Sequence, residues 1–227
     1  MIRFMTVADC RRSAGSIFLV VLAAALIFNI TASAPSRASK TSASLPETVK
    51  GPSGSEIVLD RYPGSGSVLV AVAVRAGSAW ETPDTRGVTH LLEHLLFDGS
   101  ERFTREEISG WVDDNGAFLN AFTRKEVTVY FLLVRSDLLE ESIEILSQML
   151  LHPVFSPAEI AKERKVVLEE MSQGIDDPHE IVSRAADRHL YRGSSLTEPV
   201  MGYVSTIESV SRDRIIEYYR SRYAPEN

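Results

Sequence analysis

Cysteine is almost absent from this sequence, and positive charge is scarce. The one cysteine, Cys10, can form no intrachain disulfide and cannot build a cysteine-based metal site. Lys and Arg number 24 against 31 Asp and Glu, which gives a formal net charge of −7 and a long-range field that would repel a phosphate backbone. Nucleic acid is therefore not an expected partner.

Long apolar runs are also missing, except near the N-terminus. In residues 1–34, three arginines precede an uncharged apolar run at about 13–30, and a small-residue segment follows at 32–34. This order is typical of an export signal peptide. The run is shorter than the roughly 20 apolar residues of a membrane-spanning helix. A cleaved signal is favoured, and an uncleaved membrane anchor is the alternative; both predict an exported domain, periplasmic or secreted.

Residues 35–54 lack any apolar period and are rich in Ser, Ala, Pro, Lys and Gly. A segment of this composition cannot bury enough apolar surface to order itself, so we predict a flexible tether. The whole sequence is 44% hydrophobic, and the stretch after the tether is long enough for one core. We predict a single domain over residues 55–227.

Strand-like and helix-like patterns occur in blocks within this domain. The expected strands are 56–59, 68–76, 117–121 and 127–132, the first two forming a hairpin or a neighbouring pair around a Pro-Gly-Ser-Gly turn. The expected helices lie between Gly87 and Gly99 and at 104–116, 137–151, 156–174, 177–191 and 211–222. These patterns predict an α+β fold with one mainly antiparallel sheet packed by several helices.

Capping patterns mark where several of these helices begin. Thr104 with Glu107, and Asp137 with Glu140, have the spacing of a capping box, in which two side chains satisfy free amides of the first turn. Other expected helices begin with proline, whose missing N–H is harmless in the first turn.

The residues that carry chemistry lie on the first expected helix. His90 and His94 are four residues apart, hence about 40° apart around a helix and one turn along it, so their imidazoles can share one ion. Glu93 projects from nearly the same face. Two histidines and one carboxylate leave the fourth position of a zinc tetrahedron open for water, as in catalytic sites. A chance His-x-x-Glu-His match occurs in roughly one in a hundred such sequences, and the alternative is that these side chains merely decorate a partly buried helix.

With the segments around it, this motif resembles the zinc site of inverzincin metallopeptidases, in which the commoner zinc motif is inverted. From about Val68 to Asn227 the sequence is similar to the pitrilysin, insulin-degrading enzyme and mitochondrial processing peptidase family. The segments that carry the resemblance are 75–78 with Glu81, 87–90, 97–100, 120–123 with Glu126, and 163–171.

The resemblance implies a third zinc ligand far along the chain. In the family this ligand is a glutamate within a segment like 163–171, and Glu170 matches its position, with Glu169 as the nearest rival. Glu163 matches a second acidic position, and its seven-residue spacing places it on the same helix face as Glu170. The resemblance assigns Glu163 an auxiliary catalytic role beside the metal. The alternative for all three is an ordinary solvated acidic helix face.

The same resemblance implies zinc-dependent hydrolysis of peptides, with one zinc ion per chain. His90, His94 and Glu170 would hold the ion, which would lower the pKa of its bound water and polarise the scissile carbonyl. Glu93 would act as the general base and then deliver the proton to the departing amine.

Substrate binding is implied for the strand that contains Asn120, Ala121 and Phe122. An extended peptide would add to its edge through backbone hydrogen bonds. Phe97 and Phe122 are candidates for an apolar side-chain pocket, with a place in the core as the alternative. The remaining histidines fit no ligand spacing and are interpreted as structural or surface residues: His152, His179 and His189.

Family members generally repeat this α/β unit, and the second copy closes over the first as a chamber. Only one copy is present here, and residues 223–227 look like the lead-in to a further strand. We therefore expect an incomplete first unit whose partner is a second homologous domain or subunit. The predicted function is a zinc-dependent endopeptidase. The alternatives are a non-catalytic peptide- or partner-binding subunit and a plain zinc-stabilised or metal-free α+β domain.

Overall fold

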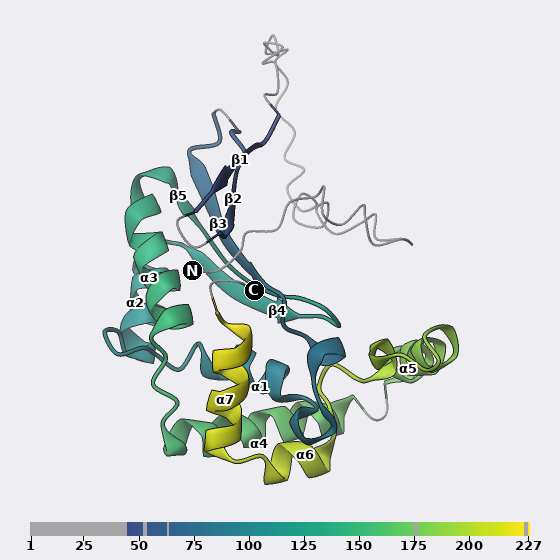
Figure 1. Cartoon of the computed structure of the whole chain (residues 1–227). Coiled ribbons are helices and arrows are strands. Elements are labelled where there is room, and N and C mark those ends of the chain that lie inside the picture. Colours follow the sequence, from purple (N-terminus) through teal and green to yellow (C-terminus); the bar gives the residue numbers. More distant parts are fainter. Residues whose placement is uncertain (1–44, 52–53, 63, 175–176, 225–226) are drawn as a thin grey trace, which may run out of the picture.

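The computed structural model describes residues 45–51, 54–62, 64–174, 177–224 and 227 (Figure 1). The expected signal peptide or anchor at 1–34 and the first part of the expected tether lie outside these residues. Within the described part of the chain, no helix combines the length and the apolar character needed to cross a membrane.

The described strands form two antiparallel sheets. A two-stranded ribbon joins β1 (Glu47–Lys50) to β2 (Glu56–Leu59). A three-stranded sheet has the order β3-β5-β4 and consists of β3 (Ser67–Val74), β4 (Phe118–Thr123) and β5 (Thr128–Arg135). The central strand is β5, so one edge of β4 has no partner strand among the described residues.

Two expectations about the strands are wrong. Segments 56–59 and 68–76 do not pair with each other, because β2 pairs with β1, and β3 pairs with β5. The buried valines of β3 share a face with the buried residues of β5, and this common apolar face decides the pairing. Order also begins before residue 55, since Glu47–Lys50 is a strand. It pairs with β2, its side chains are all exposed, and no apolar pattern marks it in the sequence.

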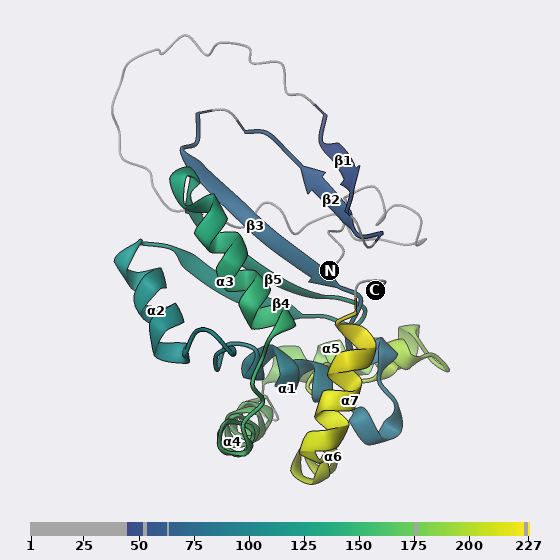
Figure 2. The ribbon, with the colours of Figure 1, turned by 60° about the vertical axis from the view of Figure 1, so that its left-hand side comes forward.

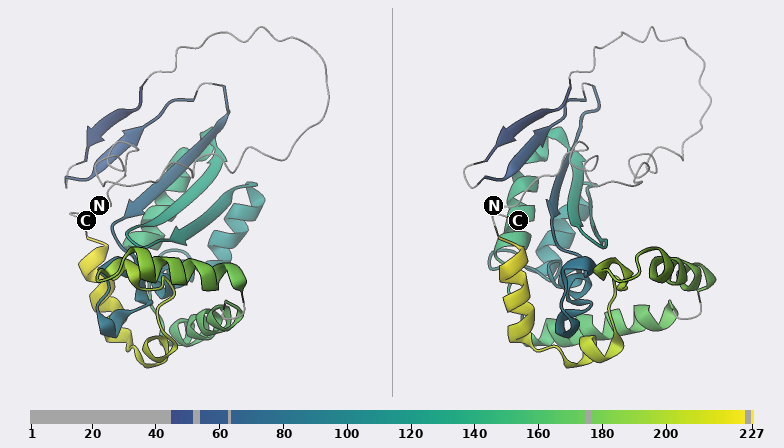
Figure 3. Two further views of the ribbon diagram at one scale, coloured as in Figure 1. Left: turned by 90° about the vertical axis from the view of Figure 1, so that its right-hand side faces the viewer. Right: turned by 45° about the vertical axis from the view of Figure 1, so that its right-hand side comes forward.

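The helices pack on one face and at one end of the three-stranded sheet (Figures 1 and 2). α3 packs against β3 and β5, and α1 packs against α4, α7 and β4. α5 stands away from the other helices (Figure 3). The helices are α1 (Val88–Leu95), α2 (Arg105–Asp114), α3 (Leu139–Leu151), α4 (Pro157–Gln173), α5 (Pro178–Leu190), α6 (Val204–Ser209) and α7 (Arg212–Arg222). Short 3-10 turns occur at Ser78–Trp80, Pro83–Thr85, Ser136–Leu138 and Ser195–Thr197.

Most of the expected helix starts are confirmed, and one is wrong. The Thr104–Glu107 capping box opens α2, and α4 and α5 begin with proline in the first turn. Asp137 does not cap α3. A 3-10 turn precedes that helix, whose N-cap is Leu138, and the Asp137 carboxylate pairs with Arg135 at 3.0 Å. The short helix α6 was not expected, because six residues are too few to show a helical period.

The start of α1 is held by buried polar contacts. The buried Glu81 carboxylate accepts hydrogen bonds from the backbone N–H of Gly87 at 2.8 Å and of Thr89 at 2.7 Å. Both are free amides of the first turn, where a negative charge is also favoured by the helix dipole. The Thr89 hydroxyl forms a hydrogen bond with the Tyr218 hydroxyl at 2.7 Å. The Glu81 contacts hold the first turn of α1, and the contact between Thr89 and Tyr218 joins α1 to α7.

Two glycines allow the backbone before α1 to lie against the segment before α6. Gly87 has φ 93° and Gly202 has φ 70°, a region that disfavours other residues. A Cβ on Gly202 would stand 2.2 Å from the Arg86 carbonyl oxygen, and one on Gly87 would stand 2.3 Å from the Met201 carbonyl oxygen. No side chain fits between these two segments.

We expect Gly202→Ala to lower the free energy of unfolding by about 2 kcal/mol or more, because it combines an unfavourable φ with a backbone clash. Gly110→Ala is the matched control. Gly110 lies in α2 with nothing within 4 Å of an added Cβ, so alanine there should stabilise the chain by up to about 1 kcal/mol. Denaturant unfolding measures both, and equal effects of the two variants would contradict the close approach at Gly202.

Candidate metal centre

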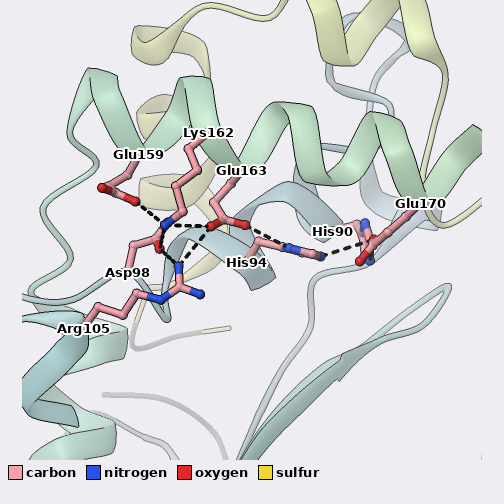
Figure 4. Close-up of polar contacts among 8 residues, drawn as sticks. All are labelled: His90, His94, Asp98, Arg105, Glu159, Lys162, Glu163 and Glu170. Carbon is pink, nitrogen blue, oxygen red and sulfur yellow. Dashed lines mark hydrogen bonds and ion pairs between the residues drawn. The ribbon is translucent and has the colours of Figure 1, made fainter. Parts of the chain in front are cut away.

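Two helices far apart in the sequence bring three ligand-type side chains together (Figure 4). α1 carries His90 and His94, and α4 carries Glu170. Oε2 of Glu170 lies 3.9 Å from Nε2 of His90 and 3.5 Å from Nε2 of His94. The three ligand atoms all lie within 4.8 Å of one another. The structure thus places together the three residues predicted as metal ligands.

These three residues fit a zinc ion. Zinc bonds of about 2.0–2.2 Å in a tetrahedron separate ligand atoms by about 3.3–3.6 Å, close to the separations found here. Burial and, to a smaller extent, the nearby charge of His94 lower the pKa of His90 to about 4. Both effects favour the neutral imidazole, which is the form that binds metal. Nδ1 of His90 is buried without a hydrogen-bond partner.

Glu93 lies on the same helix but does not belong to this ligand group. Its carboxylate accepts a hydrogen bond from the Thr123 hydroxyl at the end of β4. Burial raises the pKa of Glu93, and the hydrogen bond from Thr123 and the proximity of His94 partly offset this rise. Glu93 is thus a carboxylate with increased proton affinity, held beside the histidines from the β4 side.

Glu163 lies behind His94. Its Oε2 atom is 3.2 Å from Nδ1 of His94, whereas Glu170 faces Nε2 of the same ring. Burial of Glu163 would raise its pKa, but hydrogen bonds from Arg105, His94 and Lys162 outweigh this effect and hold the pKa below its usual value. The auxiliary carboxylate expected at this position therefore contacts the back of a candidate ligand rather than the space between the ligand atoms.

The other predicted residues fall into distinct places. Glu169 is exposed and lies outside the ligand group, which favours Glu170 over its rival. Phe97 is partly buried and packed against both hydrophobic clusters, with its ring 6.4 Å from that of Tyr130, which favours the core interpretation over the pocket interpretation. Phe122 lies on β4 beside Phe131. The remaining histidines are exposed and outside the ligand group: His152, His179 and His189.

The predicted substrate strand is the open-edged β4. Asn120, Ala121 and Phe122 pair with β5 on one side only. The backbone N–H of Ala121 donates to the side-chain oxygen of Asn120 at 2.8 Å. In an antiparallel ladder, alternate residues direct their N–H away from the neighbouring strand, and the N–H of Ala121 points in this outward direction.

Sequence reasoning missed three charged residues next to the site. Asp98, Arg105 and Lys162 surround the side of Glu163 that faces away from His94 (Figure 4). No spacing rule singles them out, because each lies on a different element and charged residues are common in this chain. The only available signal is that Lys162 precedes Glu163 directly.

The family model described as "Insulinase (Peptidase family M16)" matches residues 56–203. The chain is 34% identical over 173 residues to "Uncharacterized zinc protease YmxG" of Bacillus subtilis, a match that covers 76% of this chain and 42% of that protein. It is 29% identical over 181 residues to mitochondrial-processing peptidase subunit beta of Caenorhabditis elegans, covering 79% and 39%. The chain thus spans about two fifths of the length of these relatives.

Solved structures share the fold. A protease from Helicobacter pylori superposes with a TM-score of 0.76 at 24% identity, covering 81% of this chain and 44% of that one. The periplasmic protease PqqL of Escherichia coli superposes with a TM-score of 0.73 at 21% identity, covering 79% and 21%. The predicted α+β fold, like the first unit of pitrilysin-type proteins, is confirmed.

The low pKa of His90 makes stability depend on pH in the metal-free chain. In the unfolded chain His90 has the ordinary histidine pKa near 6.5. As the pH falls from about 6.5 towards 4, His90 therefore gains a proton in the unfolded state but not in the folded state. Stability is therefore present above this window and is lost within it. Between pH 7 and pH 5 we expect the chain to lose about 2 kcal/mol more stability than the His90→Gln variant does.

Denaturant unfolding of chelator-treated protein at several pH values measures this difference. His152→Gln is the control. The side chain of His152 is 50% exposed, so its replacement should leave the pH dependence of the unfolding free energy as it is in the wild type. Identical pH dependence in the wild type and His90→Gln would contradict a neutral, buried His90.

Proposed function

This chain belongs to the insulinase (M16) family of peptidases, and on that basis we propose that it carries the metal-binding and catalytic part of a zinc endopeptidase. The proposed substrates are peptides and unfolded segments. The observation that carries the proposal is the convergence of His90, His94 and Glu170 from two helices. Relatives of the chain are named zinc proteases, which supports zinc as the metal.

In this proposal His90 and His94 bind zinc through Nε2 and Glu170 binds it through Oε2. A bound zinc ion supplies a Lewis acid that activates water and polarises the scissile carbonyl. Glu163 orients His94 by accepting a hydrogen bond from Nδ1, which leaves Nε2 free to act as a ligand.

Glu93 moves the proton. Its raised pKa favours acceptance of a proton from the attacking water, and the same carboxyl then donates that proton to the amine that leaves. Hydrolysis then needs no nucleophile from the protein. The Thr123 hydroxyl orients the Glu93 carboxylate and connects the general base to the end of β4.

The open edge of β4 supports a binding mode for the substrate. An extended peptide can add there as a further strand. The N–H of Ala121 becomes one hydrogen-bond donor to the peptide when the Asn120 side chain rotates away from it. Because Thr123 on the same strand holds Glu93, a peptide along β4 passes beside the general base. Recognition through backbone atoms tolerates many sequences.

A second homologous domain or subunit is the proposed partner. The curated relatives are more than twice as long as the matched segment, and one is named as the beta subunit of a processing peptidase. Such a partner would enclose a peptide held on β4. The order of residues in segment 1–34 supports export as part of this proposal.

We expect Glu93→Gln to reduce peptide cleavage by about 10²-fold or more while the zinc content remains, because the base is lost and the ligands are not. Elemental analysis of the purified chain and a peptide-cleavage assay with and without chelator measure both quantities. Glu169→Gln is the control and should keep both. Loss of zinc together with activity in Glu93→Gln would contradict a base that is not a ligand. Wild-type protein that binds zinc but cleaves nothing would favour a peptide-binding subunit.

The substrate strand has its own test. Proline is tolerated on an edge strand where the N–H points outward, so Ala121→Pro should fold yet lack one donor for the peptide. We expect KM to rise about tenfold, the equivalent of one net hydrogen bond, with unchanged zinc content. Ala121→Ser keeps the N–H and should retain the wild-type KM. An unchanged KM in Ala121→Pro would argue against strand addition at β4.

A further inference from the structure

A cluster of charged side chains lies on the Nδ1 side of His94, opposite Glu170 (Figure 4). Asp98 follows α1, Arg105 is the first residue of α2, and Lys162 and Glu163 are neighbours on α4. Three helices therefore meet at this point through charged groups. Arg105, Lys162 and Asp98 have no part in the function proposed above.

The two cations hold one oxygen of Glu163. Oε1 of Glu163 lies 3.1 Å from Nη1 of Arg105 and 3.3 Å from Nζ of Lys162. The other oxygen, Oε2, faces Nδ1 of His94 at 3.2 Å. The two oxygens of Glu163 thus have different partners: Oε1 contacts the two cations, and Oε2 contacts the His94 ring.

Asp98 in turn holds the two cations. Its Oδ1 atom lies 2.5 Å from Nη1 of Arg105 and 3.3 Å from Nζ of Lys162. The side chains of Asp98 and Glu163 are only 5% and 6% exposed, so both need partners of opposite charge. Arg105 and Lys162 are about half exposed and bring their charged ends to these buried carboxylates.

Three carboxylates meet here, but they do not form a second cation site. Nζ of Lys162 lies within 3.3 Å of an oxygen of each of them, Asp98, Glu159 and Glu163. A metal ion would have to displace this ammonium group and overcome the charge of Arg105. The two cations offset most of the charge of the three carboxylates, so the cluster is a support for the Glu163 carboxylate and not a binding site.

A carboxylate that orients a metal-ligating histidine must itself be held in place. Partners behind a ligand fix the tautomer and the direction of the ring, and their loss typically weakens metal binding by about 10–100-fold. A carboxylate with only one hydrogen bond can rotate about its last side-chain bonds. Glu163 cannot rotate in this way, because Arg105 and Lys162 hold Oε1 from α2 and α4.

We propose that Arg105 and Lys162 are positioning residues of the zinc centre, which direct Oε2 of Glu163 at Nδ1 of His94 and thereby aim Nε2 of His94 at the metal. The inference rests on the proposed function, since it takes His94 as a zinc ligand. Asp98 completes the arrangement by fixing both cations. The two positioning residues touch neither substrate nor metal and act only through Glu163.

The test is the zinc dissociation constant of the full chain, measured by competition with a chromophoric chelator. We expect Arg105→Met and Lys162→Met each to weaken zinc binding by about 3–10-fold, and Glu163→Gln to weaken it by about 10–100-fold. Lys162→Arg keeps a positive charge beside Oε1 of Glu163 and should bind zinc within about twofold of the wild type. The absorption spectrum of the cobalt-loaded chain reports any change in ligand geometry independently of activity.

A double-mutant cycle separates positioning from general stability. If the cations act through Glu163, then adding Arg105→Met or Lys162→Met to Glu163→Gln should weaken zinc binding no further. The matched control is Arg102→Met, which removes an exposed ion pair with Glu144 near the start of the same helix and should leave zinc binding unchanged. Thermal unfolding of each metal-free variant records any purely structural effect.

The outcomes are distinct. Two results would overturn the positioning role while leaving the proposed function intact. The single variants could bind zinc as tightly as the wild type, or Arg105→Met and Lys162→Met could weaken zinc binding as much in the Glu163→Gln variant as in the wild type. A wild-type chain that binds no zinc would instead overturn the proposed function. If Arg105→Met does not fold, Lys162→Met decides the matter alone, because it contacts the same oxygen of Glu163.

Discussion

The packing of α1 against α4 is the contact on which the candidate site depends. His90 and His94 come from the first helix and Glu170 comes from the second, so a shift of one helix along the other would separate the three ligand atoms. α1 is fixed at its start by Glu81, Thr89 and the paired glycines, and α4 is fixed to α6 by Arg164, whose guanidinium donates to the Val210 carbonyl at 2.7 Å. Contacts at the start of α1 and in the middle of α4 thus hold the two helices that form the centre.

Buried and partly buried carboxylates contribute to this anchoring, and each has a defined partner. Glu81 holds the first turn of α1, Glu93 is held by Thr123, and Glu163 is held by Arg105 and Lys162. Burial raises the pKa of Glu81 and Glu93, whereas the cations around Glu163 keep its pKa low. Two acids on neighbouring helices therefore differ in proton affinity, which matches the difference between a proton acceptor and a fixed support.

The accuracy of the sequence-based predictions follows the range of the interactions involved. Helix starts at Thr104, Ser156 and Asp177 depend on residues within one turn, and they are confirmed. Strand pairing depends on residues far apart, and the expected pairing of 56–59 with 68–76 is wrong because β5, which is later in the chain, is the partner of β3. The Asp137 cap failed for another reason. Arg135, two residues away, offers the carboxylate an ion pair instead.

The sequence alone determined the α+β composition, the positions of most helices, and the pair His90 and His94, because a spacing of four residues puts two side chains on one helix face in any context. It also pointed to the segment that contains Glu170, through resemblance. Only the tertiary structure favours Glu170 over Glu169 as the third ligand, shows Phe97 packed against the hydrophobic clusters, and reveals the charges that hold Glu163. The crossing of α1 and α4 determines which side chains meet, and that crossing is set by the packing of the whole core rather than by any local pattern.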